Sequence, residues 1–400
     1  MHADPKLTEL TSHKRRLLVG TLDALFAQID LTDSQYETAK NRYEAVSAWL
    51  AEGESPFLKV ASIYAQGSIA VGTSNKPIGR AEFDVDLVCH LPSVGATSNP
   101  AAVKALIGDR LKAHATYASM LKEKQRCWRL CYANEFHLDI TPSIPNPACG
   151  NGGELVPDRV LSAWKPTNPK GYAARFEQYA AVRPRLYLRE AAVAAKRADV
   201  EDFPEQEMRK PALKRIVQFL KRHRDIWFAT AKRNELAPIS IILTTLAARS
   251  YAYCAARFAY GDTYELILDV VRRMSDFIAV DERNGRPFYY IENETTAGEN
   301  FADKWNLDQR LPQAFYGWHR DAIAMLEELV SIDGKDRISQ ALQKSFGASQ
   351  ENVRSAIAPL ASAVGHARAA GSLLVAPSLG VVTSPAAGRI SVRPNTFFGR

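Results

Sequence analysis

The stretch that decides the fold is Gln66-Gly67-Ser68, followed after a loop by Glu82-Phe83-Asp84-Val85-Asp86-Leu87-Val88. Successive side chains of a β-strand alternate between its two faces. Asp84 and Asp86 therefore point the same way, and the apolar residues around them point into a core. Two carboxylates at this spacing repel each other unless a cation or strong hydrogen-bond donors compensate them. The stretch predicts a cation site on one face of a strand.

The turn before this strand suits a phosphate group. Residues 60–65 predict a strand that runs directly into Gln66-Gly67-Ser68. Gly67 lets the backbone come close to a phosphate, and Ser68 offers its N–H and its hydroxyl at the positive end of a following helix. Mg²⁺ prefers carboxylate oxygens and usually arrives with the phosphates of a substrate. Turn and strand together predict a protein that handles nucleotides.

A third carboxylate supports this prediction. Residues 128–132 and 136–140 predict a hairpin whose second strand carries Asp139 between two apolar neighbours. Beside Asp84 and Asp86, it would complete a set of three carboxylates for two metal ions about 3.5–4 Å apart, one activating a hydroxyl and one steadying a leaving pyrophosphate. Taken alone, Asp139 has another explanation, an acid at a strand end that meets an arginine. The three acids together favour the metal site.

This order of a Gly-Ser turn, an Asp-x-Asp strand and a later Asp resembles the polymerase-β-like nucleotidyltransferases. The surrounding segments are similar to the bacterial cGAS/DncV-like enzymes, the CD-NTases of antiphage signalling. The similar segments are spread over about the first 310 residues and comprise 66–73, Pro77, 82–89, 157–164, 168–172, 213–225 and 299–305. A Gly-Ser turn alone is weak evidence, whereas the ordered set is specific.

The resemblance implies an α+β fold, with a polymerase-β-like nucleotidyltransferase lobe, a C-terminal helical-bundle lobe and the active site in the cleft between them. The first lobe would be a mixed sheet with flanking helices. The implied cofactor is two Mg²⁺ ions, with Mn²⁺ as the alternative. The implied site residues are Asp84 and Asp86 for both metals, Asp139 for the metal that activates the hydroxyl, Gln66, Gly67 and Ser68 for the nucleotide, and Lys221 and Ser240 for the triphosphate. Without the resemblance, Lys221 is a surface lysine and Ser240 a serine at a helix start.

The implied activity is template-independent nucleotidyl transfer that builds a cyclic di- or trinucleotide second messenger from NTPs, at least one of them a purine nucleotide. Cyclisation rests on the resemblance alone, and base identity, ring size and linkage stay open. The implied partners are an effector protein that binds the product and a regulatory protein that grips the C-terminal tail, of the ubiquitin-transfer-like or HORMA type.

Two other functions stay open at this point. A polymer-directed nucleotidyltransferase of the CCA-adding, poly(A) or protein-modifying type has the same three acids. A catalytically silent module that binds nucleic acid or protein would share the fold. The similarity through residues 299–305 favours the cyclic synthase over the first. The intact Asp84, Asp86 and Asp139 argue against the second, because a silent descendant has no need to tolerate their repulsion.

The composition limits the protein class. A chain of 400 residues with 46% hydrophobic and 24% charged content suits two packed globular modules. Its net charge of +7 fits phosphate binding but does not choose between nucleotides and nucleic acids. Because no run approaches the roughly 18 apolar residues of a membrane span and no signal peptide is evident, we expect a cytoplasmic protein without a membrane partner. Five cysteines without a CxxC pair predict reduced thiols.

Periodicity and turn residues divide the chain into three predicted parts, a catalytic lobe at 1–205, a helical lobe at 206–345 and an Ala/Ser/Gly/Pro-rich tail at 346–400. Within the tail, residues 348–370 predict a weak helix. Residues 371–400 predict a mobile peptide, or one whose apolar patches at 373–375 and 380–382 add a strand to a sheet edge.

Other helices are expected at 6–28, after Thr32 in a capping box with Gln35, and at 100–124, 212–231, 238–258, 263–280 and 311–332. Residues 142–153 are expected to be irregular.

Overall fold

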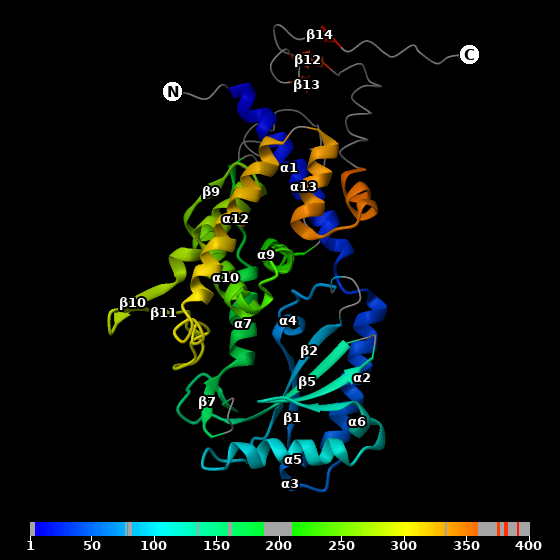
Figure 1. Ribbon diagram of the computed structural model, residues 1–400, viewed down its shortest axis with the longest axis vertical. Coiled ribbons are helices and arrows are strands. Elements are labelled where there is room, and N and C mark those ends of the chain that lie inside the picture. The colour runs from blue at the N-terminus through cyan, green and yellow to red at the C-terminus, as the bar shows by residue number, and fades with distance from the viewer. Residues whose placement is uncertain are drawn as a thin grey trace, which may run out of the picture.

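The computed structural model describes residues 5–76, 78, 82–133, 136–158, 162–187, 210–332 and 334–358, with residues 374–376, 380–382 and 390–391. It has a lobe built on a sheet and a lobe built of helices, one above the other in Figure 1. The α+β fold predicted from the sequence is confirmed. No described helix has the length and apolar character that crossing a membrane requires.

A mixed sheet forms the first lobe, in the order β1-β2-β5-β4-β3, with β6 pairing with β5 and β7 with β6. β2 and β5 run parallel, whereas the other neighbours are antiparallel. The strands are β1 Ser62–Gln66, β2 Phe83–His90, β3 Leu121–Glu123, β4 Trp128–Tyr132, β5 Phe136–Pro145, β6 Glu154–Pro157 and β7 Trp164–Thr167. The predicted hairpin is confirmed, but its second strand is longer. Pairing of β2 with β5 continues to Ser143, so residues 142–145 are not irregular.

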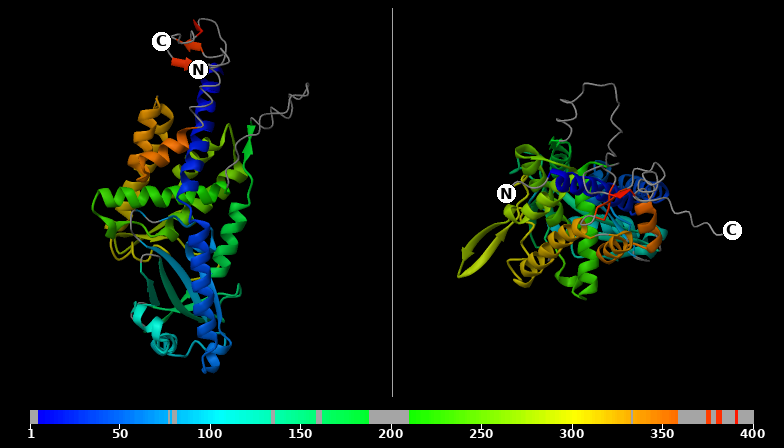
Figure 2. Two further views of the ribbon diagram at one scale, coloured as in Figure 1. Left: turned by 90° about the vertical axis from the view of Figure 1, so that its right-hand side faces the viewer. Right: turned by 90° about the horizontal axis from the view of Figure 1, so that it is seen from above.

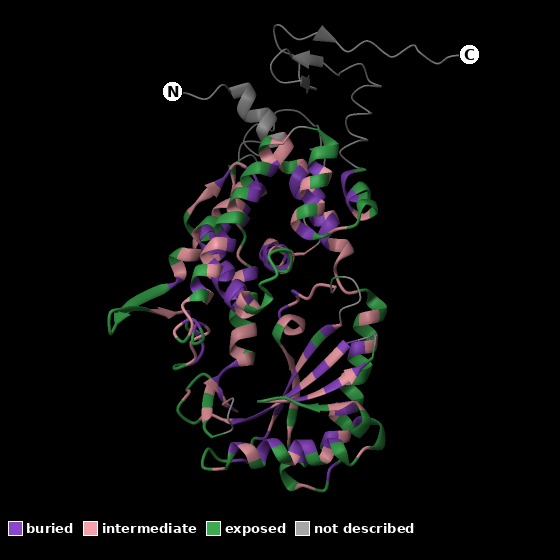
Figure 3. Ribbon diagram, in the orientation of Figure 1, coloured by how far each residue is buried: buried purple, intermediate pink, exposed green. Residues whose placement is uncertain are grey.

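One face of this sheet is apolar and packs against helices. Val85 and Leu87 of β2 and Leu138 and Ile140 of β5 are buried in a core cluster. Buried residues are purple in Figure 3 and alternate along the strands with partly buried ones in pink. Each such side chain stabilises the fold by roughly 1.5–3 kcal/mol. The helices of this lobe are α2 Asp33–Ala51, α3 Pro56–Lys59, α4 Gly67–Ala70, α5 Pro100–Lys112 and α6 Ala115–Met120. The alternation of side chains leaves the acids of β2 and β5 on the opposite face.

The second lobe surrounds one central helix. α10 Ser240–Arg257 packs against α7, α9 and α11 and buries residues on several sides, among them Leu243, Leu246 and Ala247. The other helices are α1 Pro5–Gln28, α7 Pro169–Ala180, α9 Ala212–Thr230, α11 Thr263–Arg273, α12 Arg310–Ser331 and α13 Lys335–Phe346. Short strand pairs accompany them: β8 Arg185–Leu186 with β9 Ala259–Tyr260, and the hairpin of β10 Ala279–Arg283 and β11 Arg286–Tyr290.

The two lobes do not follow the sequence order assumed in the predicted division. α1 belongs by its core to the helical lobe, where Leu18, Leu22 and Leu25 are buried. In the left view of Figure 2, α1 and α2 follow each other along the length of the molecule and so link both lobes. Residues 350–358 are helical, and Val353 and Ile357 are buried in the same core, so the tail does not begin at 346. The three-part division itself stays a prediction.

Two predicted helices are shorter than expected. The one at 100–124 ends at Lys112, and α6 begins after His114, whose Nδ1 accepts a hydrogen bond from the N–H of Tyr117. The one at 263–280 ends at Arg273, and a 3₁₀ turn leads into β10. Periodicity does not detect these local stops. The predicted capping box of Thr32 with Gln35 at the start of α2 is confirmed.

The end of the chain lies mostly outside the described residues. β12 Leu374–Ala376 pairs with β13 Gly380–Val382 and β14 Ile390–Ser391 in a small antiparallel sheet. The two apolar patches thus form strands that pair within the same segment. The rest of the predicted mobile peptide, including Phe397 and Phe398, lies outside the described residues.

Gly108 of α5 provides a test of this packing. A Cβ there would lie 2.1 Å from Cζ2 of Trp128, whose Nε1 donates a 2.8 Å hydrogen bond to the carbonyl of Lys104 and so fixes the ring. We expect Gly108→Ala to lower the free energy of unfolding by about 1–3 kcal/mol, although alanine favours a helix by roughly 1 kcal/mol. Urea denaturation measures the change. Gly150→Ala, with no atom within 4 Å, is the control and should leave the midpoint unchanged.

Candidate active site

The polar face of the sheet brings the three predicted acids together. In the parallel pairing of β2 with β5, Asp86 lies opposite Asp139 and Asp84 lies opposite His137. Gln66 of β1 lies opposite Asp86 on the other side. Side chains of directly opposed residues share a face, so the acids form the floor of one site. This arrangement follows from strand order, which the sequence did not reveal.

Arg129 of β4 joins this floor, and sequence reasoning did not single it out. Its guanidinium binds both oxygens of Asp139, with Nε 2.6 Å from Oδ1 and Nη2 2.7 Å from Oδ2. Nη2 also lies 3.1 Å from Oδ1 of Asp84. The alternative explanation for Asp139, an acid that meets an arginine, therefore holds together with the cluster of acids. The register of the hairpin places Arg129 directly opposite Asp139, and this register could have indicated Arg129 from the sequence.

The carboxyl group of Asp86 is buried beside two other carboxylates, and this environment raises its pKa. Burial, followed by repulsion from Asp139 and Asp84, raises its pKa to about 7, against the opposing effect of Arg129. The crowding of negative charge predicted from the sequence is therefore present. Carboxylate oxygens are hard donors, and a divalent cation would relieve this repulsion. The floor fits such an ion by its chemistry.

The Gly67-Ser68 turn stands directly beside Asp86. Gly67 adopts a left-handed conformation with φ of 63°, and a Cβ there would lie 2.5 Å from Oδ2 of Asp86. Only glycine combines this conformation with such a close approach to a carboxylate. The one-turn helix α4 follows, and Oγ of Ser68 accepts a 3.0 Å hydrogen bond from Oγ of Ser74. Turn and acids therefore form one site, as predicted.

Helix α9 holds the chain segment that follows this turn. Lys221 donates a 3.0 Å hydrogen bond to the carbonyl of Thr73, and Gln218 donates a 2.8 Å bond to the carbonyl of Ser74. Arg222 donates to the carbonyl of Lys76. Burial, and then Arg224, lowers the pKa of Lys221 to about 8. The helical lobe therefore binds the sheet lobe through the backbone of residues 73–76, just after the Gly67-Ser68 turn. Sequence reasoning did not predict this contact.

A cleft of about 770 Å³ lies between the lobes. Seven of the eight predicted site residues line it, namely Gln66, Gly67, Ser68, Asp84, Asp86, Lys221 and Ser240. The eighth, Asp139, is covered by the guanidinium of Arg129. Ser240 is the first residue of α10, and its hydroxyl accepts a 3.1 Å hydrogen bond from Arg224. Lys214, two turns before Lys221 on α9, binds Glu177 and does not line the cleft.

One wall of the cleft, formed by Thr167, Asn293, Glu299 and Phe301, contains polar residues that sequence reasoning did not assign. Glu299 accepts hydrogen bonds from Thr167 at 2.9 Å and from Asn293 at 2.7 Å. Burial raises the pKa of Glu299. All three residues line the cleft, together with the ring of Phe301. Residues 299–305 belong to the similar segments found in the sequence, but only the fold brings Glu299 beside Thr167, 132 residues away in the sequence.

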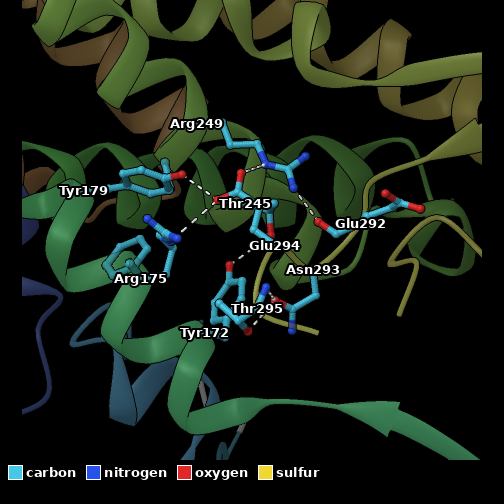
Figure 4. Close-up of a pocket in the computed structure, with 11 residues that line it drawn as sticks. Tyr172, Arg175, Tyr179, Thr245, Arg249, Glu292, Asn293, Glu294 and Thr295 are labelled. Carbon is cyan, nitrogen blue, oxygen red and sulfur yellow. Dashed lines mark hydrogen bonds and ion pairs between the residues drawn. The ribbon is translucent and has the colours of Figure 1, made fainter. Parts of the chain in front are cut away.

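A second, much smaller cavity lies behind this wall (Figure 4). It measures about 20 Å³, which is room for one water molecule. Around it, Arg249 and Tyr179 both bind the carboxylate of Glu294, and Tyr172 exchanges a 2.9 Å hydrogen bond with Thr245. These contacts tie residues 292–295 to α7 and α10. The cavity is too small for a nucleotide. The hydrogen bonds around it stabilise the wall of the cleft.

The raised pKa of Asp86 gives a pH dependence of stability. The carboxyl has a pKa near 3.9 when unfolded and about 7 when folded, so the folded state binds more protons between these values. Stability is therefore lost as pH rises through this window. In EDTA, we expect Asp86→Asn to gain stability relative to wild type from pH 5 to 7 and to keep a constant advantage above pH 7.5.

Urea midpoints across the pH range measure this difference. Asp109→Asn, which removes an exposed acid on α5, is the control and should follow the wild type at each pH. An Asp86→Asn advantage that does not change with pH would contradict the raised pKa of Asp86.

Comparisons with known proteins agree with the fold. The sequence family described as Second Messenger Oligonucleotide or Dinucleotide Synthetase domain matches residues 18–179. The chain is 29% identical to a c-di-GMP synthase of Roseivirga ehrenbergii over 98% of its length and 99% of that protein. It is 30% identical to the cyclic dinucleotide synthase CdnG of Bradyrhizobium diazoefficiens over 76% of its length and 74% of that protein.

Solved structures share the fold. The CD-NTase CdnG of Bradyrhizobium diazoefficiens in complex with GTP superposes with a TM-score of 0.61 at 24% identity, covering 86% of this chain and 98% of that one. Vibrio cholerae DncV bound to 3′-deoxy GTP gives a TM-score of 0.51 at 16% identity, covering 87% and 90%. A polymer-directed or silent function is not favoured by these relatives. The chain belongs to the cGAS/DncV-like nucleotidyltransferases, the CD-NTases, and is an enzyme that makes cyclic oligonucleotides from nucleoside triphosphates.

Proposed function

We propose that this enzyme joins two molecules of GTP into cyclic di-GMP, as a second messenger of antiphage defence. The names of the two curated relatives, a c-di-GMP synthase and a cyclic dinucleotide synthase, support this product. The observation that carries the proposed chemistry is the floor of Asp84, Asp86 and Asp139 beside the Gly67-Ser68 turn.

Each transfer forms one O–P bond and breaks another. The 3′ hydroxyl of one GTP attacks the α-phosphorus of a second GTP, pyrophosphate leaves, and the hydroxyl proton passes to solvent. A second transfer within the linear intermediate closes the ring. When bound, two divalent cations, Mg²⁺ or Mn²⁺, activate the hydroxyl and neutralise the leaving group. Asp84 and Asp86 would hold both ions and Asp139 the one at the attacking hydroxyl.

The chain's own residues orient the triphosphate. In this proposal, the N–H and hydroxyl groups of the Gly67-Ser68 turn bind phosphate oxygens, with Gln66 at the edge of the same turn. Lys221 and Ser240 reach the β- and γ-phosphates from the helical lobe. Lys221 suits this role because it lines the cleft, where burial lowers its pKa to about 8. A triphosphate beside it would stabilise its charged form.

Regulation and product use stay predictions. An effector protein would bind the product, and a ubiquitin-transfer-like or HORMA-type protein would grip the C-terminal peptide. One structural neighbour, Escherichia coli CdnC, has been solved in a complex with HORMA. The corresponding peptide here lies mostly outside the described residues. The cytoplasmic location also stays a prediction.

A product assay tests the proposed function. Wild-type protein with α-labelled GTP and Mg²⁺ should give a phosphatase-resistant product with the mass of cyclic di-GMP. Asp84→Asn with Asp86→Asn should abolish it, because the metal-binding oxygens are lost. Circular dichroism and the urea midpoint should show a folded protein. The metal-site assignment would be wrong if the folded double variant kept more than a few per cent of wild-type activity.

The triphosphate role of the helical lobe has a separate test. Lys221→Ala and Ser240→Ala should each raise the KM for GTP about tenfold with a smaller fall in kcat, because contacts to the β- and γ-phosphates stabilise ground state and transition state alike. Lys214→Ala, on the same helix but away from the cleft, is the matched control and should leave both constants near wild type. An unchanged KM with a much lower kcat would assign Lys221 and Ser240 to another role.

A further inference from the structure

The floor of the site carries positive as well as negative side chains. Strand pairing places Arg129, Asp139 and Asp86 in one row across β4, β5 and β2. The neighbouring row contains Asp84 and His137, whose Nδ1 lies 3.4 Å from Oδ1 of Asp84. Arg129 therefore places a permanent positive charge on the same face of the sheet as the three acids.

Arg129 makes the strongest of these contacts. Its Nε and Nη2 form a forked pair of short hydrogen bonds with both oxygens of Asp139, and Nη2 extends to Asp84. Such bidentate pairs are about twice as strong as neutral hydrogen bonds, and they use the same carboxylate oxygens that a hard metal ion needs. The pairing with Asp139 also raises the pKa of Arg129. Arg129 and a metal ion bound by Asp139 therefore compete.

The described part of the chain agrees with this competition. It contains no group of three or more His, Cys, Asp and Glu side chains arranged to hold a metal ion, although the three acids lie on adjacent strands. The ion pair is also accessible. The side chains of Arg129 and Asp84 are 21% and 55% exposed, so the guanidinium has room to leave without opening the core.

We propose that Arg129 is a built-in counter-cation that holds Asp139 and Asp84 in the absence of metal and must release Asp139 when a divalent cation binds. Arg129 thereby sets the affinity of the site for the cation. This inference rests on the proposed metal-binding role of the three acids. Arg129 is a positioning residue here, since it acts through Asp139.

Equilibrium binding of Mn²⁺ to the full chain without nucleotide tests the proposal, with free Mn²⁺ measured by electron paramagnetic resonance. Arg129→Met removes the competing cation and should tighten Mn²⁺ binding about tenfold, the equivalent of one charge-assisted hydrogen bond. Arg129→Lys keeps the charge without the fork and should lie between this variant and wild type. Arg42→Met makes the same charge change at an exposed position on α2, over the ring of Tyr132, and should bind like wild type.

Thermal unfolding gives a second readout. In EDTA, Arg129→Met should melt below wild type because Asp84 and Asp139 lose their counter-cation, and Mn²⁺ should raise its melting temperature by more than it raises that of wild type. Equal or weaker Mn²⁺ binding by both Arg129 variants would overturn the proposal.

The outcomes separate this proposal from the proposed function. If wild type forms cyclic di-GMP but the Arg129 variants do not tighten Mn²⁺ binding, the counter-cation role alone fails. If neither wild type nor the variants bind Mn²⁺ and no product forms, the metal-site assignment fails with it. Loss of Mn²⁺ binding in Asp139→Asn confirms that the measured ion occupies this site.

Discussion

The repulsion among three carboxylates on two parallel strands is the constraint on which the site depends. Asp86 and Asp139 are directly opposed across β2 and β5, and Asp84 lies two residues before Asp86. The apolar residues between them are buried and fix the orientation of both strands, so the acids cannot turn away from each other. The fold thus uses its hydrophobic core to hold like charges together. Arg129 offsets part of this repulsion, while burial and the remaining repulsion raise the pKa of Asp86.

The cleft depends on contacts between lobes as much as on the sheet. α9 binds the backbone carbonyls of Thr73 and Ser74 through Lys221 and Gln218. Gln218 also donates a hydrogen bond to Asp30, just after the end of α1. Three segments far apart in the sequence therefore meet beside the loop that follows the Gly67-Ser68 turn. Lys221 therefore has two roles in this interpretation, a structural bond to the loop and a charge on the cleft. Such coupling makes the position of the helical lobe part of the geometry of the site.

Polar residues of one wall complete the cleft. Glu299, Asn293 and Thr167 form a connected set of hydrogen bonds, which the network around Glu294 supports from behind. These bonds link β7 and α7 to the segment before α12, and a connected network of this kind rigidifies the wall. A rigid wall suits an enzyme that must hold nucleotides in the cleft.

The sequence by itself determined the acids Asp84, Asp86 and Asp139 and the Gly67-Ser68 turn, because each follows from a local period or motif. The α+β class followed from the family resemblance that these motifs carry. Only the tertiary structure decided that β2 and β5 are neighbours, that Arg129 binds Asp139, that α1 belongs to the helical lobe and that Glu299 lines the same cleft as Asp84 and Asp86. These facts depend on which distant segments pair. Periodicity specifies the buried face of an element, but it does not specify the partner against which that face packs.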